Sequence, residues 1–193
     1  GARNVAVGVS ALSVATTATM NVAIGQSAME GVASGVALSG AIGIGKDALT
    51  AITSTDADGT VAVGYSAGAV ITEGRYNTFI GYQAGLANTT GDANTVLGYN
   101  AFDSAVGLDN NTAVGYYALS TMSGSAGTDT HNTAVGLETM LSNTTGVCNA
   151  AFGWDSMYSN TTGTHNTATG IRSLYTNTTG SSNTASGTLA MFL

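Results

Sequence analysis

A glycine that returns at nearly constant spacing limits this chain to repeat folds more strongly than any other feature. Most of these closing glycines are 17 residues apart, and each ends a segment similar to N-T-A-V-G. They are Gly8, Gly25, Gly45, Gly64, Gly81, Gly98, Gly115, Gly136, Gly153, Gly170 and Gly187. A unit of 17 residues is too short for a helical-hairpin repeat but suits short strands and turns. We therefore expect an all-β fold, a repetitive parallel β-roll (β-solenoid) of about eleven 17-residue coils stacked on one another.

Three units are longer than the others by two to four residues. The extra residues fall near 31–40, 53–59 and 123–130, and the repeat resumes in phase after each of them. Insertions that leave the phase intact behave as loops on one side of a coil. The sequence therefore predicts a single β-roll repeat domain over 1–193 that carries three loops.

The pattern inside each unit predicts two strands. The N-T-A-V segment alternates and is rich in β-branched residues, as a first strand requires. Its fourth position is mostly large and apolar, as in Val7 and Ile24, so we expect it to point into the coil and the small third position to point outwards. The A-L pair that follows, such as Ala48-Leu49, predicts a second strand. The glycine between them supplies a turn conformation that other residues resist.

Asparagine recurs at two fixed phases, one opening N-T-A-V and one opening N-T-T-G, which predicts a polar turn. When coils stack at ~4.8 Å, equivalent amides lie above one another and can bond along the stack as ladders. The structural repeat is represented by Asn77, Gly81, Asn94, Gly98, Asn111, Gly115, Asn132 and Gly136. The N-T-T segments, which also match the N-glycosylation pattern, begin at Asn88, Asn143, Asn160 and Asn177.

Composition excludes several classes of function. Only 8% of residues are charged, the net charge is −7, and the four basic residues are scattered. Nucleic-acid binders need a basic stripe, so we expect no nucleic-acid partner. No apolar window approaches the ~18 residues of a spanning helix, so we expect no membrane insertion. The single Cys148 excludes an internal disulfide and a cysteine-cluster metal site.

The titratable residues are too dispersed to predict catalysis. His131 and His165 lie in turns, and we expect both to face solvent; Cys148 shares their phase, and we interpret it as a tolerated substitution. The segment 56–59, Asp-Ala-Asp-Gly, hints at calcium, but it lacks the further acidic ligands of a calcium loop and suits an Asx turn. The other carboxylates show no pairing that would let an acid and a base act on one substrate atom. We therefore predict no enzyme activity, no cofactor and no metal site.

An aromatic residue follows the closing glycine in several units and should form a surface stripe, because these residues share one phase. Such a stripe can stack on sugars or grip a partner, and it also suits a stacked ladder at a subunit interface. Both interpretations stay open. The ligand-surface candidates are Tyr65, Tyr82, Tyr99, Tyr116 and Trp154.

Two sets of segments resemble known repeats. The segments 21–28 (N-V-A-I-G-Q-S-A) and 60–67 (T-V-A-V-G-Y-S-A) resemble the head repeats of trimeric autotransporter adhesins. Later units, such as N-T-A-V-G-Y-Y-A-L at 111–119, resemble repeats of phage tail-fibre and tail-spike proteins. The resemblance covers nearly the whole chain. It implies a left-handed parallel β-roll in which three chains pack around a common axis.

The expected function is that of a structural or adhesive extracellular rod, a shaft or head segment of a phage tail fibre or a bacterial surface adhesin. The expected partners are further copies of the chain, as a homotrimer, and a host-surface glycan or matrix; a lone solenoid is the alternative to the trimer. Because both ends lack a polar cap, we also expect end-to-end stacking or a longer fibre. The alternative functions are ice or mineral-surface binding through aligned threonines, and a glycan-cleaving spike.

Overall fold

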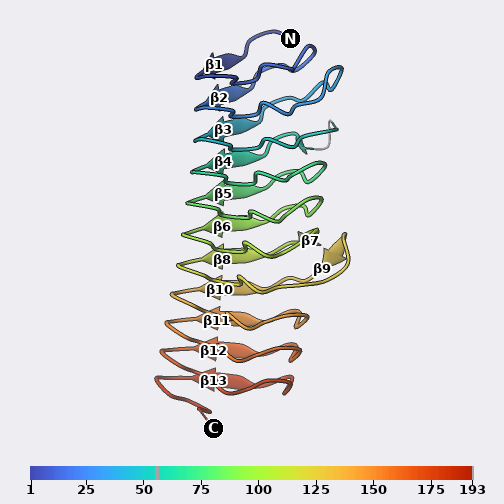
Figure 1. The fold of residues 1–193 in the computed structure, drawn as a ribbon. Coiled ribbons are helices and arrows are strands. Elements are labelled where there is room, and N and C mark those ends of the chain that lie inside the picture. The colour runs from blue at the N-terminus through green and yellow to red at the C-terminus, as the bar shows by residue number, and fades with distance from the viewer. Residues whose placement is uncertain (55–56, 193) are drawn as a thin grey trace.

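A computed structural model of the chain describes residues 1–54 and 57–192 and shows one tall stack of coils (Figure 1). Eleven three-residue strands form one sheet in the order β1-β2-β3-β4-β5-β6-β8-β10-β11-β12-β13. They are Val5–Val7 (β1), Val22–Ile24 (β2), Ile42–Ile44 (β3), Val61–Val63 (β4), Thr78–Ile80 (β5), Thr95–Leu97 (β6), Thr112–Val114 (β8), Thr133–Val135 (β10), Ala150–Phe152 (β11), Thr167–Thr169 (β12) and Thr184–Ser186 (β13). The predicted all-β solenoid of about eleven coils is therefore confirmed.

Successive strands pair in parallel and in register along the whole sheet. Val5 pairs with Val22 in the first two coils, and Thr95 pairs with Thr112 near the middle of the stack. The 21-residue unit does not disturb the register, since Thr112 pairs with Thr133 across it. Equivalent repeat positions therefore form columns that run along the stack.

The strand side chains point the opposite way from our prediction. The small third position faces into the coil, where Ala23 and Ala151 are fully buried. The large fourth position faces outwards, and Ile24 and Phe152 are 37% and 41% exposed. The coil is narrow, and its interior is filled by the Leu or Met of the A-L segment, such as the fully buried Leu49. In most coils the strand residue opposite that side chain is therefore small.

The A-L segment is a turn rather than the second strand that we predicted. Asp47 and Leu49 have φ angles of 57° and 52°, which lie in the left-handed region and not in the β region. Their backbone groups still bond from coil to coil, and the Leu49 N–H donates to the Ala67 carbonyl at 3.2 Å. A column of hydrogen-bonded turns therefore closes this side of the solenoid.

The coil that contains β5 shows how core volume is exchanged between columns. Phe79 occupies the inward strand position that is Ala in most coils, while Gly68 and Gly85 replace the Leu or Met of the nearby A-L segments. A Cβ on Gly68 would lie 2.9 Å from Phe79 Cδ2, and a Cβ on Gly85 would lie 2.5 Å from Phe79 Cδ1. The phenyl ring thus fills space that larger side chains fill elsewhere, as a close-packed interior requires.

Two constraints make the closing glycines necessary. Gly98 has a φ of +146°, a conformation that other residues rarely adopt. A Cβ at Gly98 would also overlap the carbonyl oxygen of Gly115 in the next coil. The predicted turn role of these glycines is confirmed, and their lack of a side chain also sets how closely the coils approach.

The predicted asparagine ladder is present and buried. The Asn77 side-chain oxygen accepts from the Asn94 backbone N–H at 2.9 Å, and the Asn94 side-chain oxygen accepts from the Asn111 N–H at 3.0 Å. The Asn132 N–H continues the ladder by donating to the Asn111 side chain at 3.2 Å. Each side-chain oxygen therefore accepts from the N–H of the asparagine that precedes the next strand, a buried group that would otherwise lack a partner.

The longest insertion adds a small second sheet rather than a plain loop. Leu108–Asp109 (β7) pairs in parallel with Thr128–Asp129 (β9), which lies within the predicted insertion 123–130. Figure 1 shows β7 and β9 at the edge of the stack opposite the tips of the sheet arrows, where the closing glycines follow the strands. In the insertion 53–59, Thr55 and Asp56 lie outside the described residues, as does Leu193 at the end of the chain.

Candidate binding surface

The four candidate tyrosines form a ladder on the outside of four consecutive coils. Tyr65 and Tyr82 stack with ring centroids 5.1 Å apart, as do Tyr82 and Tyr99, and the centroids of Tyr99 and Tyr116 are 5.3 Å apart. The Lys46 ammonium lies 5.6 Å from the centroid of Tyr65, over its ring. Within the ladder, the face of each tyrosine ring is therefore covered by the neighbouring tyrosine. The ring edges and hydroxyl groups are accessible.

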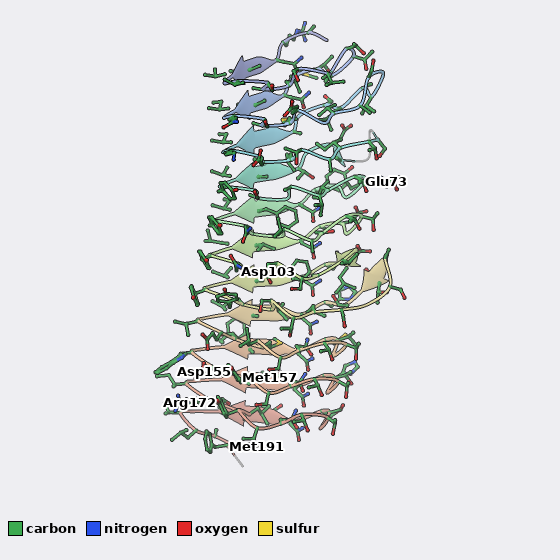
Figure 2. The ribbon with its side chains drawn as sticks, viewed as in Figure 1. Glu73, Asp103, Asp155, Met157, Arg172 and Met191 are labelled. Atoms are coloured by element: carbon green, nitrogen blue, oxygen red, sulfur yellow. The ribbon has the colours of Figure 1, made fainter. Side chains whose placement is uncertain are left out.

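The fifth candidate, Trp154, lies apart from this ladder in a cluster near the C-terminal end. The Arg172 guanidinium lies over the Trp154 ring at 5.1 Å and over the Tyr175 ring at 5.5 Å. Arg172 Nε also donates to Asp155 Oδ2 at 3.1 Å, and Figure 2 shows these two residues at the same edge of the stack. Arg172 covers one face of the indole and pairs with a buried carboxylate. The cluster therefore mainly links two adjacent coils.

The ladder is part of a larger apolar surface, which we call the apolar stripe. It consists of the large apolar residues directly before and directly after the closing glycines. Those before are Val7, Ile24, Ile44, Val63, Ile80, Leu97, Val114, Val135 and Phe152; those after are Val9, Tyr65, Tyr82, Tyr99, Tyr116, Leu137, Trp154 and Ile171. Most of them are exposed, and the two columns follow one another along the stack. Towards the C-terminal end the strand column becomes polar, with Thr169 and Ser186.

The tyrosine ladder has one lateral neighbour that the sequence analysis missed. Tyr117 lies edge-to-face against the ladder, with its centroid 4.6 Å from that of Tyr116 and 5.8 Å from that of Tyr99. Burial, then Tyr116, Tyr99 and the charge of Asp103, raise the pKa of Tyr117. The available signal was the Tyr116-Tyr117 pair, where two aromatic residues are adjacent in sequence.

Polar groups lie beside Tyr117. Asn100 Nδ2 donates to Asp103 Oδ2 at 3.0 Å, while the Asn100 side-chain oxygen is buried without a hydrogen-bond partner among the described residues. Ser104 Oγ donates to Asp103 Oδ1 at 3.4 Å. Burial raises the pKa of the Asp103 carboxyl, against the opposing effect of the Asn100 hydrogen bond. Asp103, labelled in Figure 2, is thus a half-buried acceptor on the outer surface of the stack.

A second group of carboxylates gathers at the insertion edge. Asp109 Oδ1 accepts from the Asp92 N–H at 2.8 Å, and Asp92 Oδ1 accepts from the Arg75 N–H at 2.8 Å. Burial raises the pKa of Asp109, and the charges of Asp92 and Asp129 add to this effect. Asp58 accepts in the same way from the Ser39 N–H, whereas Asp56 lies outside the described residues. These carboxylates bond neighbouring coils to one another.

The remaining candidates have simple structural roles. His131, His165 and Cys148 are exposed at turn positions with positive φ, which confirms the predicted solvent-facing placement of the two histidines. The asparagines of the N-T-T segments form a second ladder, in which Asn160 Nδ2 donates to Asn143 Oδ1 at 3.0 Å. Asn143 and Asn160 are fully buried, so their match to the glycosylation pattern does not describe an accessible acceptor.

Several kinds of site are absent from the part of the chain that the structure describes, residues 1–54 and 57–192. No three side chains of His, Cys, Asp or Glu are grouped so that they could hold a metal ion. No pocket is present in these residues. They also contain no helix with the length and apolarity needed to cross a bilayer.

Comparison with known proteins adds no relative. No family model matches the chain, and no curated protein or solved structure matches it. The architecture is thus established by the structure itself, as a parallel β-solenoid of repeated coils.

Proposed function

We propose that the chain is a structural and adhesive segment of an extracellular rod, the shaft or head of a phage tail fibre or a bacterial surface adhesin. In this proposal three copies pack side by side through the apolar stripe, and the rod binds a host-surface glycan or matrix. Copies also stack end to end, which would continue the parallel register of strands from one copy into the next. The proposed role is not enzymatic.

The exposed apolar stripe is the observation that carries this proposal. Leu97, Phe152 and Trp154 are each more than 40% exposed, and the stripe continues over ten coils. Seventeen such side chains expose on the order of 1,000 Å², given that one aromatic residue has about 150–250 Å² to bury. A standard protein interface buries about 800 Å² per partner. Exposed apolar patches of this extent mark contact surfaces.

The outward direction of the large strand residues favours side-by-side packing. Our expectation placed alanine on the outer face of the strands, which offers little area. The structure instead places Ile24, Ile80 and Phe152 there. Large apolar side chains in register form a ridge, and copies of a straight ridge can pack along their full length.

A stiff rod also suits adhesion in physical terms. Equivalent groups repeat at each coil, so several weak contacts can form on one rod and add through effective concentration. The carboxylates that come together, Asp92 and Asp109, already bond backbone groups of adjacent coils. They support stacking of the coils, which agrees with a proposed structural role.

The test is the mass of the intact chain in solution, measured by multi-angle light scattering. We expect a mass three times the 19.0 kDa of one chain. The double variant Leu97→Thr, Phe152→Thr should dissociate, because threonine already occupies this column at Thr169. Thr169→Ser, in the same column, is the matched control and should remain trimeric. A wild-type chain that is monomeric at all concentrations would contradict the trimer and favour a lone solenoid.

A second candidate, ice or mineral-surface binding, is favoured by one observation. Thr78, Thr95, Thr112 and Thr133 lie in register on the outer face of the sheet. The N-T-T threonines do not add a second free row, since Thr144 and Thr161 donate their hydroxyls to the next coil. Thermal hysteresis of the purified chain, abolished by Thr95→Val with Thr112→Val, would replace the adhesive proposal with this one.

A further inference from the structure

We propose that Tyr117, Asp103 and Asn100 form a binding subsite for one uncharged sugar ring, midway along the rod. This inference rests on the proposed adhesive function and names both the ligand class and the place where it binds. The three residues come from two adjacent coils, and the register of β6 and β8 holds them together.

Sugar rings pack their C–H faces against the open face of an aromatic ring. In the tyrosine ladder, stacking uses the faces: the Tyr82 ring lies between Tyr65 and Tyr99, nearly parallel to both at 10° and 8°. Tyr117 is rotated by 78° from Tyr116 and by 65° from Tyr99. Rings that are stacked on each other can cover a crossing ring on one side at most. The second face of Tyr117 is therefore not covered by the ladder and is the natural platform for a sugar.

Acceptors for sugar hydroxyls lie next to this platform. The Asp103 carboxylate is half-buried, so its exposed part can accept from a ligand. Within the chain it accepts from Asn100 Nδ2 at 3.0 Å and from Ser104 Oγ at 3.4 Å, and it also has backbone hydrogen bonds at Asp103 and Ser104. The Asn100 side-chain oxygen has no donor among the described residues although it is buried, and such a group normally finds one. A sugar hydroxyl beside Tyr117 can donate to the exposed part of the Asp103 carboxylate, which the Asn100 side-chain amide holds in place. A small number of fixed polar groups beside an apolar surface is how binding sites orient a ligand.

The charges around the subsite select an uncharged sugar. Asp103 is its one ionisable carboxyl, and burial raises the pKa of Tyr117, which keeps the phenol neutral and able to donate. The basic residues Lys46 and Arg172 contact other rings, Tyr65 and Trp154. An acidic sugar would bring a carboxylate close to Asp103 in a chain of net charge −7. We therefore expect neutral hexoses or N-acetylhexosamines rather than sialylated or sulfated glycans.

The repeat supplies substitutions that the fold already accepts. Tyr117→Gln copies Gln83, which occupies the same repeat position, and Asp103→Ser copies Ser120. The matched control is Asp47→Gln, which places the same glutamine at the same repeat position in a distant coil, outside both the apolar stripe and the subsite. The intact chain and the three variants are applied to arrays of immobilised neutral, sialylated and sulfated oligosaccharides. Affinities for the best neutral probe are then measured by calorimetry.

We expect the wild-type chain to bind neutral probes, with a loss of about tenfold or more in Tyr117→Gln and Asp103→Ser and no loss in Asp47→Gln. Equal binding by all four proteins would overturn the subsite, and so would a preference for sialylated or sulfated probes. No glycan binding by a chain that still adheres to cells would also overturn it, while leaving the adhesive function in place. Failure of the wild-type chain to adhere to any cell surface would instead remove the proposed function.

Discussion

The strands β2 and β13 stand near opposite ends of the stack and share one backbone but not one surface. Both place an alanine inside, and Ala23 and Ala185 are buried to 0% and 4% exposure. Their outer residues differ, since β2 carries Val and Ile whereas β13 carries Thr and Ser. The inner columns therefore fix the coil, and the outer columns can vary without altering it. We therefore expect residues that bind a partner to lie in the outer columns.

The strongest test of this division is a closing glycine, which belongs to neither face. Gly98→Val introduces a β-branched side chain at a φ of +146° and directs it onto the Gly115 carbonyl. We expect a loss of about 5 kcal/mol or more, enough to prevent stacking at this coil. Circular dichroism and chemical unfolding measure the effect. Gly35→Ala is the control: Gly35 also has a positive φ, of +89°, but a Cβ there would meet nothing within 4 Å, so this variant keeps backbone strain without the overlap and should cost far less.

The next test compares the loss of an inner phenylalanine with the loss of an outer one. Phe79→Ala leaves a cavity that Gly68 and Gly85 cannot fill, so we expect a loss of about 3–5 kcal/mol in urea unfolding. Phe152→Ala removes the same ring from the outer face and should cost less than about 1 kcal/mol in the separated chain. Equal losses in the two variants would show that the inner column does not carry the stability of the coil.

The columns themselves were predictable because a fixed period places equivalent residues above one another. The positions of Asn94 and Gly98 in their ladders follow from spacing alone. The direction of the strand was not predictable in this way. The alternation of the sequence indicates that Ala23 and Ile24 face opposite sides of the strand, but it does not indicate which of them faces the interior. The larger apolar side chain, Ile24, was predicted to be buried, whereas Ala23 is the buried residue. The deciding quantity is the width of the coil, which depends on the turn at Leu49.

The candidate site was only partly predictable for a related reason. The tyrosine ladder lies in one column, so its common phase was visible in the sequence. The cluster of Tyr117, Asp103 and Asn100 joins two columns from two coils, and its distances depend on turns with positive φ. A repeat pattern predicts which residues stack above one another in a column. Contacts between different columns can be predicted only when the shape of the coil in cross-section is known.

A ladder asparagine tests the inner polar column and should have an intermediate effect. Asn94→Ala removes the acceptor of the Asn111 N–H and the donor to the Leu108 carbonyl, which is 2.8 Å from Asn94 Nδ2. We expect a loss of about 2–3 kcal/mol, because buried polar groups are left without partners. Hydrogen exchange at Asn111 should increase in parallel. Asn177→Ala, at a half-buried position of the second ladder, should cost less than Asn94→Ala.

The carboxylates at the insertion edge predict a smaller, pH-dependent effect on stability. Since burial raises the pKa of Asp109 above its usual value of 3.8, the folded chain holds this proton more tightly than the unfolded chain does. The associated stability is fully present below about pH 3.8 and is lost as the pH rises through the raised pKa. Asp109→Asn keeps the side-chain oxygen that accepts from Asp92, and it should flatten this part of the stability profile. An unchanged profile in urea unfolding between pH 3 and 7 would contradict the assignment of the shift to Asp109.

The smallest effect on the coil, and the sharpest test of the comparison between β2 and β13, comes from exchanging their outer chemistry. Ile24→Thr gives β2 the character of the C-terminal coils, and Thr169→Val gives β12 the character of the N-terminal ones. Each change should alter the stability of a separated chain by less than about 0.5 kcal/mol, since neither touches the buried column.

Unfolding measured over a range of protein concentrations separates the stability of the single chain from the contribution of association, because association makes the unfolding midpoint depend on concentration. Ile24→Thr should weaken that dependence and Thr169→Val should strengthen it, because only the outer face is shared between copies. A large, concentration-independent loss in Ile24→Thr would instead mean that the outer residues help to hold the coil itself, and the division between inner and outer columns would fail.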